Sequence, residues 1–306
     1  MKKFLSALGV VATLFFVNCK KDDDVSYTPP RPYDEVYAEN IAQIEEYLQT
    51  HSISVTKNGN GDVTNVVFDT ITDGTTASIY TQTDFPIKTY IFKSDEVEYK
   101  IYYLQLDDKP DNIATFEDIT YGNKPSGADA VITSYKGYTL NGNMFDSNEI
   151  GAKFDLTGVI AGWQLIIPQF RSGSSQFESD GTLNYTNYGS GVMFVPSGLA
   201  YFNNGSSGIP AYAPLIFTFN LNQVFYLDQD GDGILSRYEF GYSEDGKLID
   251  TDGDGIPNYL DRDDDNDGYL TLEEIKINGV IPPFEDILNC QGTTGGLKKH
   301  LDPTCH

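Results

Sequence analysis

The chain is poor in cysteine, histidine, tryptophan and basic side chains. Its 306 residues include three cysteines, three histidines and one tryptophan, and 20 basic residues stand against 45 acidic ones. His51, His300 and His306 share no catalytic or metal-binding spacing with the cysteines, although His306 beside Cys305 stays open as an incidental ligand. The net charge of −25 argues against nucleic acid as a partner, because phosphate binding requires clustered Lys and Arg.

The N-terminal apolar run is too short to span a membrane. It extends from Phe4 to Val17 and follows Lys2 and Lys3. A basic start followed by a short apolar run is typical of a secretory signal. We therefore predict a signal peptide over residues 1–18.

The run ends in Phe16-Val17-Asn18-Cys19, which resembles the lipobox of bacterial lipoproteins and implies that Cys19 is acylated and becomes the first residue. The next five residues, Lys20-Lys21-Asp22-Asp23-Asp24, resemble the export tag of Bacteroidetes lipoproteins. These resemblances imply a linker over 19–32 and a cell-envelope lipoprotein exposed on the outer membrane. The alternatives are an ordinary secretion signal with an incidental cysteine, and a charge run that is merely solvated.

Cys290 and Cys305 are the other two cysteines, and both lie in the Gly-rich tail over 277–306. Cysteines of an exported chain meet an oxidising compartment, where thiols pair. We predict a disulfide between these two residues.

Residues 33–85 are predicted to form an extension made of a helix and a hairpin. Apolar residues recur at helical spacing over 33–50. The stretch from Ile53 to Thr72 is typical of a hairpin, because Asn58 to Asp62 supplies turn residues that tolerate positive φ. The run from Glu96 to Leu106 is predicted to be the first long strand of the following domain.

Aromatic and apolar residues recur in short motifs from Tyr135 onward. These motifs are Tyr135-Lys136-Gly137, Asn141 to Ser147, Val159-Ile160-Ala161-Gly162-Trp163, Pro196 to Tyr201, Gly208-Ile209-Pro210 and Leu215-Ile216-Phe217. Their order and spacing resemble those of FKBP-type prolyl isomerases. The resemblance implies an α+β domain over 86–226, in which an antiparallel sheet wraps on a short helix. It also implies peptidyl-prolyl cis-trans isomerase activity of the FKBP type (EC 5.2.1.8) on proline-containing polypeptides, and a pocket for an FK506-like macrolide.

Prolyl isomerisation requires no acid, base or metal. Resonance gives the amide bond its rotation barrier of about 18–20 kcal/mol, and X-Pro bonds relax over tens to hundreds of seconds. An aromatic pocket weakens this resonance, because the polar resonance form loses its solvation there while the twisted amide does not. Shape, desolvation and one or two hydrogen bonds are therefore the expected means of catalysis.

The resemblance assigns nine catalytic residues and their roles. They are Tyr135, Phe145, Asp146, Val159, Ile160, Trp163, Tyr201, Ile209 and Phe217. Trp163 is expected to form the floor of the pocket. The Ile160 N–H and the Tyr201 hydroxyl are expected to hydrogen bond to the substrate, and Asp146 to face the carbonyl at the rotating bond.

Several departures from the family pattern favour a rival function. Ala152 stands where the family usually has Phe, and Phe202 replaces the Gly after the pocket Tyr. Pro168 is expected to break the short helix that starts near Val159. An insertion over 171–193 brings tyrosines that could cover the pocket or bind a partner. The alternative function is a degenerate FKBP-like module that binds protein or glycan on a calcium-stiffened surface stalk.

The region 227–276 carries three acidic loops with regular spacing. Oxygen side chains stand at positions 1, 3, 5, 9 and 12 of each twelve-residue loop, Gly stands at position 6, and position 7 offers a carbonyl. The candidate ligands are Asp228, Asp230, Asp232, Ile234, Ser236 and Glu239; Asp250, Asp252, Asp254, Ile256, Asn258 and Asp261; and Asp263, Asp265, Asp267, Tyr269, Thr271 and Glu274. This spacing predicts Ca²⁺, which takes six to eight oxygens, with a weaker second loop because it ends in Asp.

These loops resemble EF-hand loops, but only Arg262 separates the second loop from the third, which leaves no room for an entering helix. The arrangement is more similar to the Asp-rich repeats of thrombospondin type 3, and implies structural Ca²⁺. The whole architecture resembles the FKBP-type isomerase lipoproteins associated with gliding motility in Bacteroidetes. We therefore expect a lipid-anchored isomerase that assists the folding of exported or surface proteins.

Overall fold

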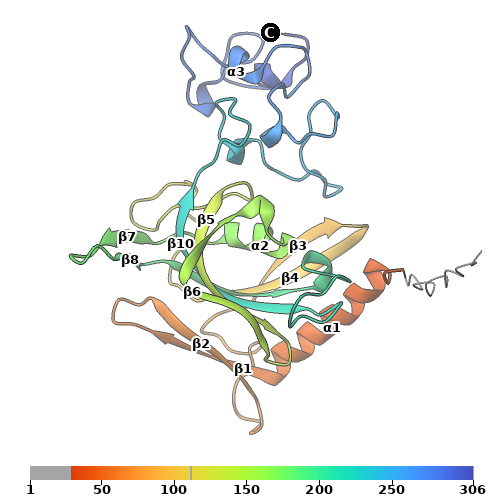
Figure 1. Ribbon diagram of the computed structural model, residues 1–306, viewed down its shortest axis with the longest axis vertical. Helices are drawn as coiled ribbons and strands as arrows, with labels where there is room; N and C mark the ends of the chain where they lie inside the picture. The colour runs from red at the N-terminus through yellow and green to blue at the C-terminus, as the bar shows by residue number, and fades with distance from the viewer. Residues whose placement is uncertain (1–28, 111, 306) are drawn as a thin grey trace, which may run out of the picture. The chain divides into compact units, whose positions relative to one another are not determined.

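The computed structural model describes residues 29–110 and 112–305, and the predicted signal peptide, Cys19 and the acidic tag after it lie outside this range. Among the residues that the structure describes, no helix combines the length and apolar content needed to cross a membrane. The described chain begins with helix α1 (Tyr33–Thr50), followed by strands β1 (His51–Lys57) and β2 (Val63–Thr70) (Figure 1). These elements confirm the predicted helix and hairpin.

A six-stranded antiparallel sheet forms the centre of the fold. Its strand order is β3-β4-β9-β10-β5-β6. The strands are β3 (Lys88–Ser94), β4 (Val97–Gln105), β5 (Ala130–Thr139), β6 (Met144–Asp155), β9 (Gly189–Val195) and β10 (Leu215–Phe225). The strand predicted from Glu96 to Leu106 is confirmed as β4 (nine residues), and the shorter β3 (seven residues) precedes it in the same sheet.

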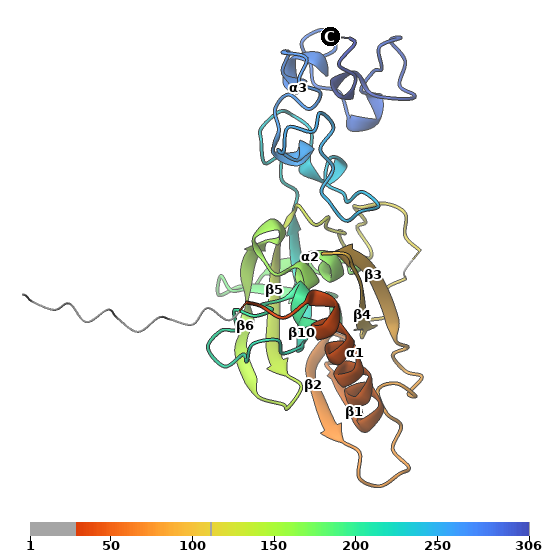
Figure 2. The same ribbon diagram turned by 90° about the vertical axis from the view of Figure 1, so that its right-hand side faces the viewer.

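The sheet curves around the short helix α2 (Ala161–Ile166), as Figures 1 and 2 show. A 3-10 helix (Ile167–Gln169) with Pro168 in its first turn follows at once, and the α-helix ends where Pro168 was expected to end it. Gly162 lets α2 approach the sheet closely, because a Cβ at this position would lie 2.4 Å from a methyl carbon of Val195. The sequence around Gly162 therefore fixes how near the helix lies to β9.

Alternation along β10 divides the interior into two cores. Phe217 and Phe219 face α2 and join a core with Trp163. Ile216 points to the other face, where Ile44 of α1 packs with residues of the β1–β2 hairpin in a second core. The extension predicted over 33–85 is therefore packed directly on the sheet.

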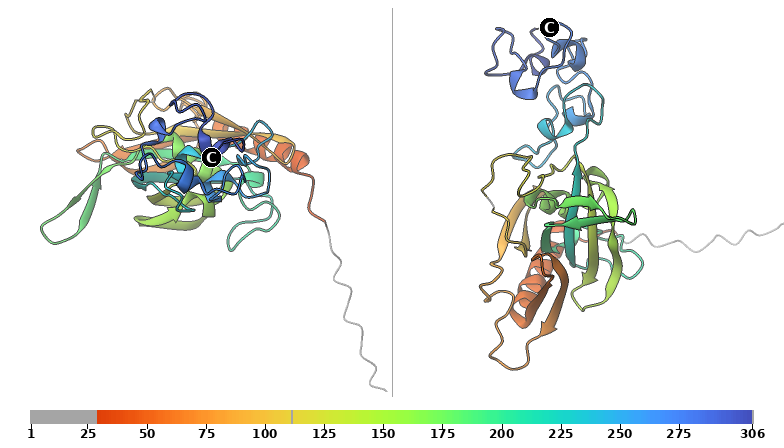
Figure 3. Two further views of the ribbon diagram at one scale, coloured as in Figure 1. Left: turned by 90° about the horizontal axis from the view of Figure 1, so that it is seen from above. Right: turned by 90° about the vertical axis from the view of Figure 1, so that its left-hand side faces the viewer.

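The predicted insertion over 171–193 is shorter than expected. It contains a separate hairpin of β7 (Ser174–Phe177) and β8 (Leu183–Thr186), which projects from the main sheet in Figures 1 and 3. From Gly189 the chain enters β9, in which all seven residues are buried. The last part of the predicted insertion is thus a central strand of the sheet.

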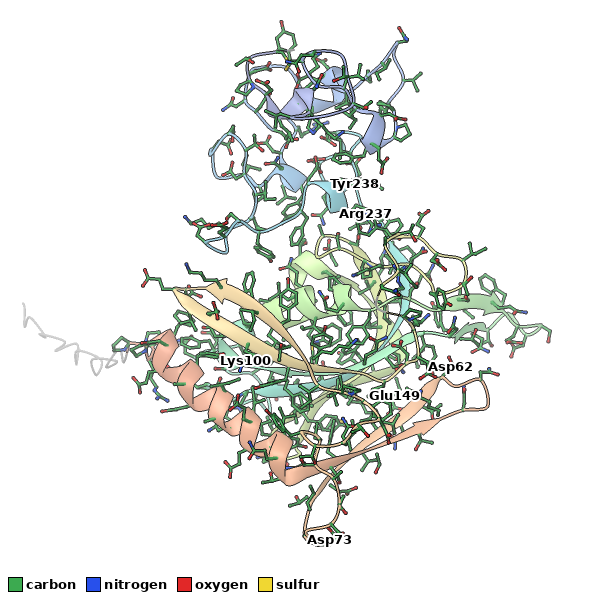
Figure 4. The ribbon with its side chains drawn as sticks, turned by 180° about the vertical axis from the view of Figure 1, so that it is seen from behind. Asp62, Asp73, Lys100, Glu149, Arg237 and Tyr238 are labelled. Atoms are coloured by element: carbon green, nitrogen blue, oxygen red, sulfur yellow. A yellow bond between two sulfur atoms is a disulfide. The ribbon has the colours of Figure 1, made fainter. Side chains whose placement is uncertain are left out.

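The acidic region folds as loops and short helical turns, including α3 (Thr271–Glu274). A small core of Ile234, Ile275 and Ile287 holds it together, and Cys290 and Cys305 form the predicted disulfide with their Cα atoms 5.8 Å apart. Arg237, labelled in Figure 4, attaches the region to the sheet domain, because its guanidinium lies 3.6 Å from the ring centroid of Phe116.

Candidate functional site

A cavity of about 620 Å³ opens between α2, β5, β6 and β10. Most of its lining is aromatic or aliphatic. The lining residues are Tyr135, Phe145, Asp146, Phe154, Gly158, Val159, Ile160, Ala161, Trp163, Ala200, Tyr201 and Phe217. Eight of the nine predicted catalytic residues are among them, so the tertiary structure brings these side chains to one place.

Edge-to-face packing of aromatic rings builds the floor and walls. Trp163 is 4% exposed, and its ring centroid lies 5.3 Å from that of Tyr135, 5.5 Å from that of Phe217 and 5.6 Å from that of Phe154. Phe145 packs on Phe217 in the same manner at 5.6 Å. These T-shaped contacts fix each ring by its neighbours, so the cavity is preformed.

Gly137 on β5 makes room for this aromatic cluster. A Cβ at this position would lie 2.6 Å from the Phe145 ring and 3.0 Å from the Phe217 ring. A side chain at this position would therefore displace one or both rings from their present packing. The Tyr135-Lys136-Gly137 motif thus has a packing role as well as a lining role.

Four polar groups belong to residues that line the cavity: the hydroxyls of Tyr135 and Tyr201, the carboxylate of Asp146 and the N–H of Ile160. The Tyr135 hydroxyl donates a hydrogen bond of 2.7 Å to the Asp146 carboxylate. Ile160 is the N-cap of α2, and its N–H meets no acceptor among the described residues. Burial, and then the hydrogen bond to Asp146, raise the pKa of Tyr135 to about 12, while burial and the Asp146 charge raise the pKa of Tyr201. Both tyrosines therefore stay neutral near pH 7 and can donate.

Ile209 is the one predicted site residue that does not line the cavity. Its side chain is buried in the same core cluster as Trp163 and Phe217. Sequence reasoning missed Phe154, whose ring packs edge to face on both Tyr135 and Trp163. Its signal was the alternation of β6, and its ring supplies a wall although Ala152 carries only a methyl group.

Two departures from the family pattern leave the cavity unchanged. Phe202 adopts positive φ and stacks on Tyr33 of α1, with ring centroids 4.1 Å apart, so its ring packs outside the cavity lining. The insertion contributes no lining residue. Tyr185 and Tyr188 instead line a second cavity of about 340 Å³ beside β2. Of the two roles left open for the insertion tyrosines, the structure speaks against covering the aromatic pocket, and binding a partner stays untested.

Comparison with known proteins supports the same assignment. Residues 122–222 match the family model for FKBP-type peptidyl-prolyl cis-trans isomerase. The FKBP-type isomerase FkpA of Aeromonas hydrophila is 34% identical over 119 residues, which cover 38% of this chain and 39% of that protein. Residues 122–222 form an FKBP-type domain.

Other similar proteins also match only part of the chain. FkpA of Escherichia coli K12 is 30% identical to this chain over 106 residues, or 34% of each chain. A crystal structure of Escherichia coli FkpA matches with a TM-score of 0.30 and 24% identity, over 44% of this chain and 51% of that one. The chain therefore spans about two fifths or less of the length of these curated relatives. Beyond the FKBP-type domain, residues 225–295 match the model described as BamM C-terminal.

The acidic loops that follow the FKBP-type domain share one backbone conformation. Positions 4 and 6 have positive φ in all three, at Gly231 and Gly233, at Gly253 and Gly255, and at Asn266 and Gly268. Gly and Asn tolerate this left-handed region better than other residues. The position-5 carboxylate of each loop accepts the N–H of position 7 at 2.7–2.8 Å. The sequence spacing therefore produces three equivalent turns.

Carboxylates converge inside these turns. The acidic side chains at positions 1, 3 and 5 have oxygens within 4.8 Å of one another in every loop. Many carboxylate oxygens of the loops are buried without a hydrogen-bond partner among the described residues, including Oδ2 of Asp230 and Asp252 and, at position 12, Glu274 Oε1. Buried carboxylates require a counter-charge, and a hard divalent cation with oxygen ligands fits this donor set.

The pKa values of carboxyl groups in the loops also agree with a bound divalent cation. Burial, and then neighbouring carboxylates, raise the pKa of Glu239 to about 10 and that of Glu274 to about 8. Without a cation, the ionised form of both carboxyl groups is therefore disfavoured at neutral pH. The position-9 residues hold the loops instead of pointing freely inward, because Ser236 Oγ, Asn258 Oδ1 and Thr271 Oγ1 each accept the N–H of position 2.

Proposed function

We propose that the FKBP-type domain catalyses cis-trans isomerisation of X-Pro bonds in polypeptides. The observation that carries this proposal is the preformed aromatic cavity with an unpaired N–H at its edge. A prolyl ring on Trp163 would leave water together with its amide, and the N–H of Ile160 would donate a hydrogen bond to a substrate carbonyl. Desolvation then favours the twisted amide, which has less charge separation than the planar one.

The polar residues would position the substrate without exchanging protons. Tyr201 lines the cavity as a neutral phenol that can donate a hydrogen bond to a substrate carbonyl. The hydrogen bond from Tyr135 holds Asp146, which would face the carbonyl at the rotating bond. A millionfold acceleration corresponds to about 8 kcal/mol, which differential binding of the twisted amide has to supply.

We further propose that Cys19 anchors the chain by lipid in the cell envelope, on the outer membrane, and that its substrates are exported or surface proteins. The support is the lipobox-like sequence, which lies outside the described residues. The acidic loops would bind Ca²⁺ through Asp228, Asp250 and Asp263 with their companion ligands, and the ion would neutralise the buried carboxylates. Extracellular Ca²⁺ modules bind at about 10⁻⁴ to 10⁻³ M, so the ions would be structural.

The rival function is a binding module that holds polypeptide or glycan without isomerising it. The β7–β8 hairpin and its second cavity favour this rival, because they add a surface outside the aromatic pocket. Both functions predict that an FK506-like macrolide changes the fluorescence of Trp163, the only tryptophan in the chain. Only catalysis separates them.

The test is exchange of a proline peptide between its cis and trans forms, measured by NMR in millimolar Ca²⁺. We expect Phe145→Ala and Tyr201→Phe to lower the catalysed rate, while Tyr185→Phe in the hairpin leaves it unchanged. Circular dichroism of each variant checks the fold. Absence of catalysis by the folded wild type would favour the binding module, and unchanged rates in Phe145→Ala would contradict the assigned pocket.

A further inference from the structure

Asp264 is an acidic residue that the twelve-residue pattern does not use. It stands at position 2 of the third loop, where the first two loops have Gln229 and Thr251. Those two side chains hydrogen bond to neighbouring protein groups, the Ala128 carbonyl and the Asn258 amide. An acidic side chain at position 2 is therefore peculiar to the third loop.

The fold carries Asp264 to the first loop. One carboxylate oxygen from each of Asp232, Glu239 and Asp264 lies within 4.8 Å of the others. Asp232 and Glu239 hold positions 5 and 12 of the first loop. All three residues are more than nine-tenths buried, with exposures of 1%, 7% and 1%. Two loops that are separated by the whole second loop thus contribute carboxylates to one cluster.

The free oxygens in this cluster have no protein partner. Asp264 Oδ2 contacts the Thr271 hydroxyl at 3.4 Å, whereas Asp264 Oδ1 has no hydrogen-bond partner among the described residues. Asp232 Oδ2 and both carboxylate oxygens of Glu239 are also buried without one. No ion pair with Lys or Arg reaches these three residues in the described chain. Three buried carboxylates at this distance would repel strongly, so the site requires a cation.

Packing around the cluster fixes its geometry. Ile234 of the first loop and Ile275, which follows the third loop, share one small core. Gly233 lies so close to α3 that a Cβ on it would be 3.2 Å from Leu272. The first and third loops are therefore held against each other by apolar contacts on one side of the carboxylates.

We propose that Asp264 is a ligand of the divalent cation in the first loop, so that the first and third loops hold this ion jointly. The inference rests on the proposed binding of Ca²⁺ by the loops. Three carboxylates offer up to six oxygens, which suits Ca²⁺ because this ion accepts six to eight oxygen ligands. The shared ion links the first loop to the third loop, whose ligands are about thirty residues apart in the sequence.

The test is Ca²⁺ binding to the purified chain, measured by titration calorimetry on wild type, Asp264→Asn and Glu273→Gln. Glu273→Gln removes the same charge from an exposed position of α3 and is the matched control. We expect Asp264→Asn to weaken one site about tenfold or more, because ligand charge sets the affinity of such sites. Glu273→Gln should bind like wild type.

Thermal unfolding distinguishes a ligand from a structural residue. Asp264→Asn removes repulsion in the cation-free state, so its melting temperature in chelator should rise above that of wild type, while its gain on adding Ca²⁺ should shrink. A lower melting temperature in both conditions would overturn the inference in favour of a structural role. Equal affinities in wild type and Asp264→Asn would also overturn it. A wild type that binds no Ca²⁺ would instead overturn the proposed calcium binding itself.

Discussion

The Tyr242 hydroxyl donates a hydrogen bond of 2.7 Å to Gln164 Oε1. Gln164 follows Trp163 on α2, and Tyr242 follows the first acidic loop. Phe240 supports the same junction, because a Cβ on Gly127 would lie 2.5 Å from its ring and 3.1 Å from the Gln164 side chain. The acidic module thus touches the helix that carries the pocket floor.

This contact predicts that the acidic module influences catalysis. Tyr242→Phe should lower kcat/KM about twofold to tenfold, since one hydrogen bond contributes about 0.5–1.5 kcal/mol. Removing Ca²⁺ with chelator should lower the wild-type rate in the same NMR exchange assay. If Tyr242→Phe and chelator both leave the rate intact, the module is mechanically independent of the pocket.

Gly162→Ala is expected to destabilise the FKBP-type domain. The added Cβ would meet Val195 at 2.4 Å, and overpacking of a buried contact costs about 1–3 kcal/mol. Gly158→Ala is the control, because a Cβ there would meet nothing within 4 Å. Urea denaturation measures both, and equal midpoints for the two variants would contradict the close approach of α2.

The catalysed rate should not depend on the protonation of the pocket tyrosines between about pH 6 and pH 9. Tyr135 has its pKa raised to about 12 and Tyr201 has its pKa raised, so both remain neutral in this window. A raised folded-state pKa means that the stability contributed by Tyr135 is fully present below its unfolded pKa of about 10, and is lost as the pH rises through about 12. Absorbance of tyrosinate, titrated in wild type and in Tyr135→Phe, checks this pKa: the group that is missing in the variant should ionise near pH 12 in wild type.

Arg237→Ala should weaken the attachment of the acidic module. The guanidinium lies 3.6 Å from the Phe116 ring centroid and 4.1 Å from that of Tyr226, and it donates to the Lys124 carbonyl at 3.1 Å. Losing these buried contacts should cost about 2 kcal/mol. Lys276→Ala, at an exposed position, is the control. Proteolysis at the junction should accelerate in Arg237→Ala alone, and equal rates would show that Arg237 does not hold the module.

The sequence by itself determined the local elements of this protein. Helical spacing predicted α1, turn residues predicted the β1–β2 hairpin, and glycine placement predicted the three acidic turns, because each depends on residues adjacent in the chain. The order of aromatic motifs likewise identified most of the cavity lining. These patterns involve residues close together in the chain, or the order of motifs along it, so they can be recognised without knowledge of the fold.

Only the tertiary structure decided which distant side chains meet. It placed Phe154, which was not predicted, in the cavity lining, and it placed Ile209, which was predicted there, in the core outside that lining. It also turned Phe202 onto α1 and brought Asp264 to the first loop. Burial and packing depend on strand order and on close approach at residues such as Gly162, and no spacing along the chain encodes these distances.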